Sequence, residues 1–355
     1  MRTIAAAAAR DGDNFIGLRH VAALMVLWAH SWSYLDRATE PLARALAGFD
    51  SGRFGVYLFF AISGFLITLA LCRNDALPRY AWHRALRVYP AYAACLLVSV
   101  FAIGATFTTL PLSDYLAHPR TWSYFTSNGM LISLQWDLPG VFVDQPLSGL
   151  VNGSLWSLGA EIRWYSLFGV LALFGLFRHR RLFTVVAALL IADSLRRHGW
   201  PLAHLTTSPA ITQLFLLGAL AALWRDVVPL SARVLVPLWL VAIGCVQTRF
   251  GASLLIVACV YLALYVAYAL PVLKLPKFDY SYGLFLYGAP IQQSLITLFP
   301  DITPLPLFAT AFVFTLPLAM LSWHLIEAPA LRHKHHFDDL DPLRRWRRST
   351  PRRNH

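Results

Sequence analysis

Arginine and histidine recur inside the apolar stretches of this 355-residue chain. An ionisable side chain at the centre of a membrane helix costs roughly 2.5–3.5 kcal/mol on insertion scales, so each one needs a reason. The stretch GLRHVAALMVLWAHSW contains Arg19 and His30, eleven residues apart. This spacing is close to three helical turns and places both side chains on one helix face, about 16 Å apart. It suits a site with two ends, with anion binding at Arg19 and proton transfer at His30. A snorkelling arginine and a core histidine bonded to a neighbouring helix would give the same pattern.

Two further arginines open a later apolar stretch, RYAWHRALRVYPAY. Arg84 and Arg87 are three residues apart and therefore share one face of the expected helix. Two guanidinium groups side by side can clamp a phosphate or pyrophosphate through paired hydrogen bonds. The alternative is ordinary anchoring of a helix end by positive charge.

Two acids also fall at the ends of apolar stretches. Glu161 lies in NGSLWSLGAEIRWYSLFG, just after Trp156 and Ser157, and could orient a histidine or hold a hydroxyl group. Glu327 lies in SWHLIEAPALR and could neutralise an arginine at the same depth. A purely structural ion pair is the alternative for Glu327.

The composition describes a chain that is solvated by lipid. Hydrophobic residues make up 57% of it, charged residues only 14%, and the mean hydropathy is +0.55. The net charge of +12 could indicate nucleic-acid binding, but the basic residues lie between apolar runs, so no nucleic-acid partner is expected. The four cysteines form no CxxC pair and have no histidine at ligand spacing, so no metal site is expected.

The apolar stretches predict an all-α membrane protein with about ten transmembrane helices. They lie near 17–36, 54–72, 88–108, 155–177, 182–195, 210–224, 232–248, 251–271, 281–299 and 305–327. When the breaks are assigned alternately to the two sides, most Lys and Arg fall on one side, which predicts that the N- and C-termini are both cytoplasmic. The expected organisation is a cytoplasmic segment over 1–16, a transmembrane domain over 17–328 and a basic cytoplasmic tail over 329–355.

The longest segment between these stretches, 109–154, is rich in aromatic residues, proline and glycine. It is expected to form a structured lid or a re-entrant element on the outer side. An interfacial aromatic belt without a catalytic part is the alternative.

Several strings, taken together and in order, resemble the acyltransferase-3 family of integral-membrane O-acyltransferases that modify bacterial glycans. Beside the Arg19 to His30 spacing they are FGVYLFFAISGFLIT at 54–68, RALRVYP at 84–90, LWSLGAE at 155–161, YGLFLYGAP at 282–290 and HLIEAP at 324–329. Each string alone is a weak signal. Their common order over most of the chain carries the resemblance.

The resemblance implies a donor and an acceptor on opposite sides of the bacterial inner membrane. The donor would be an acyl-CoA, most often acetyl-CoA, used as a substrate from the cytoplasm, with no permanently bound cofactor. The acceptor would be a sugar hydroxyl of a surface or exported polysaccharide, or of its lipid-linked precursor. The expected partners are the lipid bilayer and the glycan. No soluble esterase-like domain is expected, so the protein would work alone or with separate polysaccharide-assembly proteins.

The resemblance also assigns roles to residues. His30 would be the catalytic histidine, Arg19 its essential partner and Glu161 a supporting acid. On the donor side it would place Arg84 and Arg87 as phosphate ligands, with Glu327 and Ser63 beside them. Whether His30 acts as a general base or carries the acyl group transiently stays open at this point.

The chain departs from the family pattern at three positions. Gly288 stands where the family frequently has a histidine, Tyr57 replaces the usual acid after the valine of the second span, and Glu161 stands alone where a pair of acids is usual. These departures concern the acceptor side. They keep open a catalytically degenerate assembly component, and a secondary transporter or flippase is a further alternative from another class.

Overall fold

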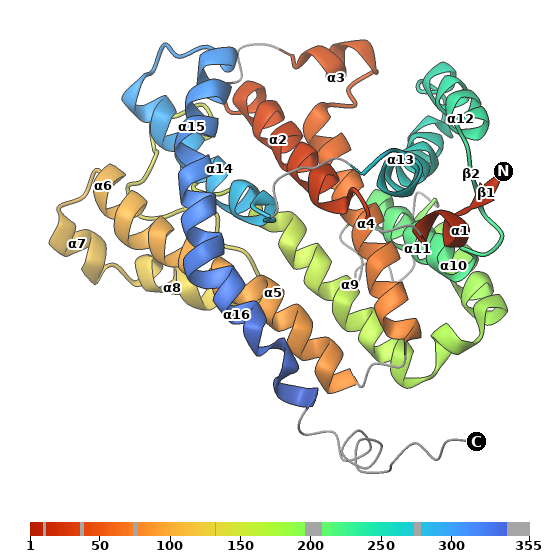
Figure 1. The fold of residues 1–355 in the computed structure, drawn as a ribbon. Coiled ribbons are helices and arrows are strands. Elements are labelled where there is room, and N and C mark those ends of the chain that lie inside the picture. The colour runs from red at the N-terminus through yellow and green to blue at the C-terminus, as the bar shows by residue number, and fades with distance from the viewer. Residues whose placement is uncertain are drawn as a thin grey trace.

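The computed structural model describes residues 1–9, 12–35, 39–73, 77–131, 133–195, 208–272 and 278–338, and it is almost entirely helical (Figure 1). The first half of the chain contains α1 (Ile4–Ala8), α2 (Phe15–Ser33), α3 (Pro41–Ala45), α4 (Ser51–Cys72), α5 (Leu77–Leu97), a π-helix (Val98–Gly104), α6 (Ala105–Phe107), α7 (Leu112–Ala117), α8 (Pro119–Gly129) and α9 (Leu155–Leu173). The second half contains a 3-10 helix (Leu176–Arg178), α10 (Arg180–Ser194), α11 (Pro209–Leu223), α12 (Ala232–Gly244), α13 (Gly251–Tyr268), α14 (Ser281–Leu298), α15 (Pro304–Ser322), a π-helix (Trp323–Glu327), α16 (Ala328–Arg332) and a 3-10 helix (His333–Asp338). Two short strands, β1 (Arg2–Thr3) and β2 (Pro229–Leu230), pair antiparallel.

Each of the ten apolar segments predicted from the sequence coincides with a helix or with a continuous run of helices. Four of these are long and apolar enough to cross a membrane: Ser51–Cys72, Leu77–Phe107, Gly251–Tyr268 and Pro304–His335. Two shorter apolar helices are Pro209–Leu223 and Ala232–Gly244. These helices indicate a membrane protein, while the number of crossings and the sides of the termini stay predictions. Residues 339–355 of the predicted basic tail lie outside the described residues.

Close packing of α2, α4 and α11 forms the centre of the molecule (Figure 1). A methyl group at Gly55 on α4 would overlap the backbone carbonyl of Ala22 on α2, and one at Gly64 would overlap the backbone of Phe215 on α11. Small residues let helix backbones approach where lipid supplies no hydrophobic drive between helices. Gly52 on α4 faces Ala29 on α2, whereas Gly55, further along α4, faces the earlier residue Ala22, so these two helices run antiparallel.

The segment 109–154 is a structured element rather than a loose connection. It contains α7 and α8, and Tyr115 and Tyr124 are completely buried. The Tyr115 hydroxyl donates to the carbonyl of Val100 at 2.9 Å, and the side-chain amide of Asn152 donates to the carbonyl of Leu286 at 2.9 Å. The expectation of an ordered element is confirmed, and its location on the outer side stays a prediction.

Candidate active site

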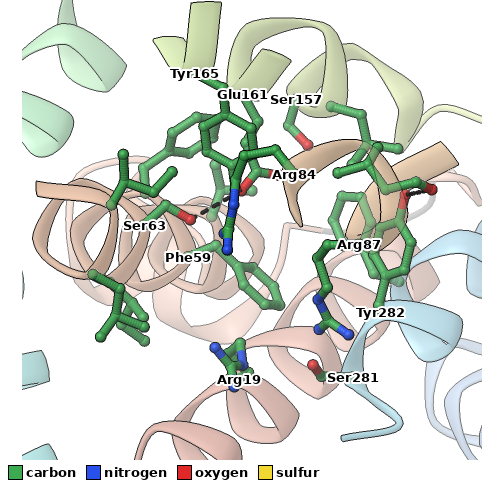
Figure 2. Close-up of a pocket in the computed structure, with 18 residues that line it drawn as sticks. Arg19, Phe59, Ser63, Arg84, Arg87, Ser157, Glu161, Tyr165, Ser281 and Tyr282 are labelled. Carbon is green, nitrogen blue, oxygen red and sulfur yellow. Dashed lines mark hydrogen bonds between the residues drawn. The ribbon is translucent and has the colours of Figure 1, made fainter. Parts of the chain in front are cut away.

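A cavity of about 110 Å³ lies between α2, α4, α5, α9 and α14, and charged side chains from separate helices point into it (Figure 2). Its polar lining residues are Arg19, Ser63, Arg84, Arg87, Ser157, Glu161, Tyr165, Ser281 and Tyr282. Apolar residues of α4, together with Val88 of α5, Leu158 of α9 and Phe285 of α14, complete the wall. We call this the arginine cavity.

The three arginines predicted from the sequence to bind anions all line this cavity (Figure 2). Arg19 comes from the first half of α2, and Arg84 and Arg87 come from successive turns of α5. The prediction that Arg84 and Arg87 share one helix face is confirmed. Tertiary packing brings Arg19 to the same place from a helix more than sixty residues earlier in the chain.

Two acids hold Arg87 and Arg19. The Asp279 carboxylate lies 2.8 Å from Nη2 of Arg87 and 3.0 Å from Nε of Arg19. The Arg19 contact has the distance of an ion pair without the geometry of a hydrogen bond, since this Nε has no hydrogen-bond partner within the described residues. Glu327 reaches Arg87 from the other side, with 3.3 Å between Oε2 and Nη1.

Asp279 is buried, with 5% of its surface exposed, and it lies just before α14. Burial alone would raise the pKa of this carboxyl, but Arg87 and Arg19 outweigh that effect and lower the pKa to about 2. Asp279 is therefore ionised at any physiological pH. Its single charge fixes two of the three guanidinium groups.

Arg84 is the third arginine of the cavity, and neither Asp279 nor Glu327 pairs with it. In the part of the chain that the structure describes, it forms no ion pair with a carboxylate, and its buried Nε has no hydrogen-bond partner. Its guanidinium lies over the Tyr165 ring, 5.8 Å from the ring centroid. A guanidinium that forms no ion pair among the described residues, in a cavity with two others, is suited to an anionic ligand such as a phosphate.

Ser63, Glu161 and Tyr165 form a hydrogen-bonded group on the wall of the arginine cavity (Figure 2). The Ser63 hydroxyl donates to Oε1 of Glu161 at 2.9 Å, and the Tyr165 hydroxyl donates to the same oxygen. Tyr165 lies one turn after Glu161 on α9, which explains how both reach one point. This group can orient a polar part of a ligand.

A second and larger cavity, of about 740 Å³, contains His30. The other polar or aromatic residues that line it are Trp32, Ser33, Thr39, Glu40, Asp50, Arg53, Tyr57, Ser154, Trp156, Ser208 and Phe285. We call this the histidine cavity. The His30 ring stacks on Tyr34, with 4.7 Å between the ring centroids and 16° between the ring planes.

The acids of the histidine cavity have partners of their own. Glu40 accepts a hydrogen bond of 3.0 Å from the indole nitrogen of Trp28, and Asp50 caps the first turn of α4. Two other polar atoms at this cavity, Nε1 of Trp32 and Oγ of Ser154, are buried without a hydrogen-bond partner in the described part of the chain. Buried polar groups normally have partners, so these atoms point to a polar ligand.

The sequence-derived residues thus separate into two groups. Arg19 and His30 share α2, as expected, but Arg19 faces one cavity and His30 the other. Glu161 lies with the arginines and not beside His30, because its position six residues into α9 carries it about 9 Å along the helix. Glu327 lines neither cavity and forms an ion pair with Arg87, which is one of the roles expected for it.

The sequence interpretation missed two residues. Asp279 stands two residues before a predicted span, and an acid at that point could have been matched with the arginines expected at the same depth. Tyr165 follows Glu161 at i, i+4 spacing, which places both on one helix face. Neither signal identifies its partner without the fold.

The structure also describes two of the departures from the family pattern. A methyl group at Gly288 would lie 2.8 Å from Cδ1 of Leu27, so α14 approaches α2 at this point and a histidine there would displace Leu27. Tyr57 is buried and lines the histidine cavity. Tyr57 thus stands at this cavity in place of the acid expected from the resemblance.

Comparison with known proteins gives one family and two full-length relatives. A family model described as an acyltransferase domain matches residues 13–324. An O-acetyl transferase of Shigella phage Sf6 is 28% identical over 324 residues, covering 87% of this chain and 93% of that protein. Nodulation protein 10 of Rhizobium leguminosarum bv. viciae is 27% identical over 354 residues, covering 90% of this chain and 93% of that protein. No solved structure matches the chain.

Proposed function

Because this chain belongs to the acyltransferase-3 family, we propose that it transfers an acyl group, by preference acetyl, from cytoplasmic acyl-CoA to a sugar hydroxyl. The acceptor in this proposal is a surface or exported polysaccharide, or its lipid-linked precursor. The enzyme would be a multi-pass protein of the bacterial inner membrane with both termini in the cytoplasm. The O-acetyl transferase among its relatives, which is similar over nearly the whole length, supports the choice of acetyl.

The observation that carries this proposal is the arrangement of two chemically different cavities along the same helices. One has three guanidinium groups that suit the phosphates of a coenzyme A donor. The other has a histidine, tryptophans and unpartnered polar atoms that suit a sugar. Val56 and Phe285 line both, so the two cavities are neighbours.

The division of labour follows from the residues. Arg84, which forms no ion pair among the described residues, binds donor phosphate together with Arg87 and Arg19. Asp279 and Glu327 hold Arg87 in place, and the Ser63–Glu161–Tyr165 group orients the remainder of the donor. These roles need no permanently bound cofactor and no metal.

In the reaction, His30 takes the proton of the acceptor hydroxyl as the oxygen attacks the thioester carbon. A new carbon–oxygen bond forms, the carbon–sulfur bond breaks, and the coenzyme A thiolate leaves and is protonated. The products are the sugar ester and free coenzyme A. Direct transfer by general-base catalysis requires no covalent enzyme intermediate.

The test is acetyl transfer by purified protein in nanodiscs. Release of coenzyme A from acetyl-CoA is followed by chromatography, because a thiol reagent would also meet the four free cysteines. Acetyl groups on surface polysaccharide are then compared by mass spectrometry between a strain with the gene and its deletion. Loss of O-acetyl groups in the deletion supports the proposal, and an unchanged polysaccharide contradicts it.

The same purified protein also distinguishes an enzyme from the alternative, a transporter. Two cavities with a narrow partition between them are also expected of a carrier that opens to alternate sides. Proteoliposomes supplied with labelled acetyl-CoA distinguish the two functions. Label that enters the vesicles without becoming attached to an acceptor would favour transport.

A further inference from the structure

A thin partition divides the arginine cavity from the histidine cavity. Of the described residues, only Val56 of α4 and Phe285 of α14 line both. Helices α2, α4, α9 and α14 pass alongside both cavities. The cavities therefore follow one another along the bundle and do not lie in separate parts of the molecule.

The division is sharpest along α4. The α4 residues that line the histidine cavity are Asp50, Gly52, Arg53 and Tyr57, whereas those that line the arginine cavity are Phe59, Phe60, Ile62, Ser63, Leu66 and Ile67. Val56 lies near the boundary between the residues of the histidine cavity and those of the arginine cavity. The same change occurs on α9 between Trp156 and Ser157.

Phe285 closes the partition from the opposite helix. It is buried, with 8% of its surface exposed, and its ring meets the Phe59 ring edge-on with 5.8 Å between centroids. Two polar residues of the arginine cavity, Ser281 and Tyr282, lie one turn before Phe285 on α14. A side chain can change rotamer at less cost than a backbone segment can move.

We propose that Val56 and Phe285 form the passage through which the acyl group reaches the histidine cavity, and that the width of this passage selects short acyl groups. The inference rests on the proposed function. Two apolar residues, which are not among the candidate site residues drawn from the sequence, would then decide between acetyl and longer acyl donors.

The chemistry requires such a passage. The phosphates of the donor stay at the arginines, while the acceptor oxygen must bond to the thioester carbon in reach of His30. The acyl carbonyl must therefore stand at the partition when the carbon–oxygen bond forms and the carbon–sulfur bond breaks. Each methylene added to the acyl chain then needs space beside Val56 and Phe285.

The experiment compares acetyl-, butyryl- and hexanoyl-CoA with the protein in nanodiscs. Two quantities are measured for each donor: its affinity, by competition with labelled coenzyme A, and the rate of coenzyme A release in the presence of acceptor membranes. Wild-type protein should prefer acetyl-CoA in both. Phe285→Ala should raise the ratio of butyryl to acetyl transfer by roughly 10-fold or more, the scale on which a pocket separates substrates that differ by a methylene.

A change at Val56 tests the passage from the other helix. Val56→Ala, which removes less volume than Phe285→Ala, should move the ratio in the same direction, and it serves if Phe285→Ala does not fold. Val56→Phe should narrow the passage, so that coenzyme A still binds while acetyl transfer falls at least about 10-fold.

Phe60→Ala is the matched control. It is the same substitution on α4, one turn beyond Val56, and Phe60 lines the arginine cavity only. It should keep the wild-type preference for acetyl. An equal shift in Phe60→Ala would overturn the proposal, because enlargement of the donor cavity alone would then explain the result.

The proposal would equally be overturned if Phe285→Ala and Val56→Ala both fold and both keep the wild-type ratio of butyryl to acetyl transfer. Failure of the proposed function has a different signature, since wild-type protein would then bind acetyl-CoA without releasing coenzyme A. The affinities for the three donors would still decide whether the partition restricts the acyl chain.

Discussion

Arg84 and Arg87 are neighbours of the same type on one helix, yet the structure predicts opposite consequences when each is replaced by methionine. Arg87 is held by Asp279 and Glu327, whereas Arg84 forms no ion pair with a carboxylate in the described residues. Arg87→Met should therefore act mainly on stability. Arg84→Met should act mainly on donor binding.

The magnitudes follow from burial. Removing one member of a buried ion pair costs roughly 3–5 kcal/mol, because the other charge is left without a partner. Asp279 and Glu327 are nearly inaccessible, with side chains 7% and 2% exposed, but Arg87 is 23% exposed and Asp279 keeps Arg19. We expect Arg87→Met to lower the free energy of unfolding by about 2 kcal/mol, after this discount for solvent.

Arg84→Met leaves no acid without a partner, so its effect on the free energy of unfolding should stay under about 1 kcal/mol. In the proposed complex with the donor it removes a hydrogen bond between a charged group and a phosphate, which contributes about 1.5–3 kcal/mol. The KM for acetyl-CoA should accordingly rise roughly 10- to 100-fold. Methionine keeps the length and the apolar stem of arginine, so packing changes little.

The assay measures both quantities on the same preparations. Unfolding temperature in detergent reports stability, and coenzyme A release at varied acetyl-CoA concentration reports KM. The double variant Arg87→Met with Glu327→Gln is the control, because it removes the charge that Arg87→Met leaves unpaired. It should recover part of the lost stability, and the cycle of single and double variants isolates the pair.

The reasoning would be refuted if Arg84→Met destabilised the protein as much as Arg87→Met. It would also be refuted if the double variant were as unstable as the sum of its single variants. The first result would mean that the two arginines are held in equivalent ways, and the second that Arg87 and Glu327 do not stabilise each other.

Three further predictions concern the remaining parts of the site. His30→Ala should lower the rate of acetyl transfer by roughly 10²- to 10⁴-fold while the affinity for coenzyme A is retained, and an active His30→Ala protein would remove His30 from the mechanism. Gly288→His should lower the free energy of unfolding by about 1–3 kcal/mol through its clash with Leu27, and Leu27→Ala in the same chain should restore part of it in thermal melts. Because its arginine neighbours lower the pKa of Asp279 to about 2, its stabilising charge is present at neutral pH and is lost as the pH falls towards 2, so the difference in unfolding temperature between wild type and Asp279→Asn should shrink on acidification. A difference that stays constant from pH 7 to pH 3 and below would contradict that assignment.

The helices could be predicted from the sequence because their signals are local. Apolar runs and short polar breaks define ten segments, and each overlaps a helix or several consecutive helices. Local spacing also predicted that Arg84 and Arg87 act together, since residues three apart on a helix necessarily share a face. The order of the family strings then identified the chemistry.

The membership of the site was less predictable, because it depends on which helices touch. Glu161 and Ser63 are 98 positions apart in the chain, and Arg87 and Asp279 are 192 apart. No period within one segment encodes such contacts. Glu161 was accordingly expected near the histidine, whereas the packing of α9 against α4 and α5 brings it to the arginines.

The sequence by itself determined that this chain consists of apolar helices with arginines, a histidine and acids at defined positions, because hydrophobicity and helical period act between near neighbours. The tertiary structure decided that Asp279 joins Arg19 to Arg87, that Arg84 has no ion-pair partner among the described residues, and that Val56 and Phe285 separate two cavities. Those features arise only where side chains of distant segments meet. The physical reason is that burial, ion pairing and cavity shape are properties of the packed bundle and of no single helix in it.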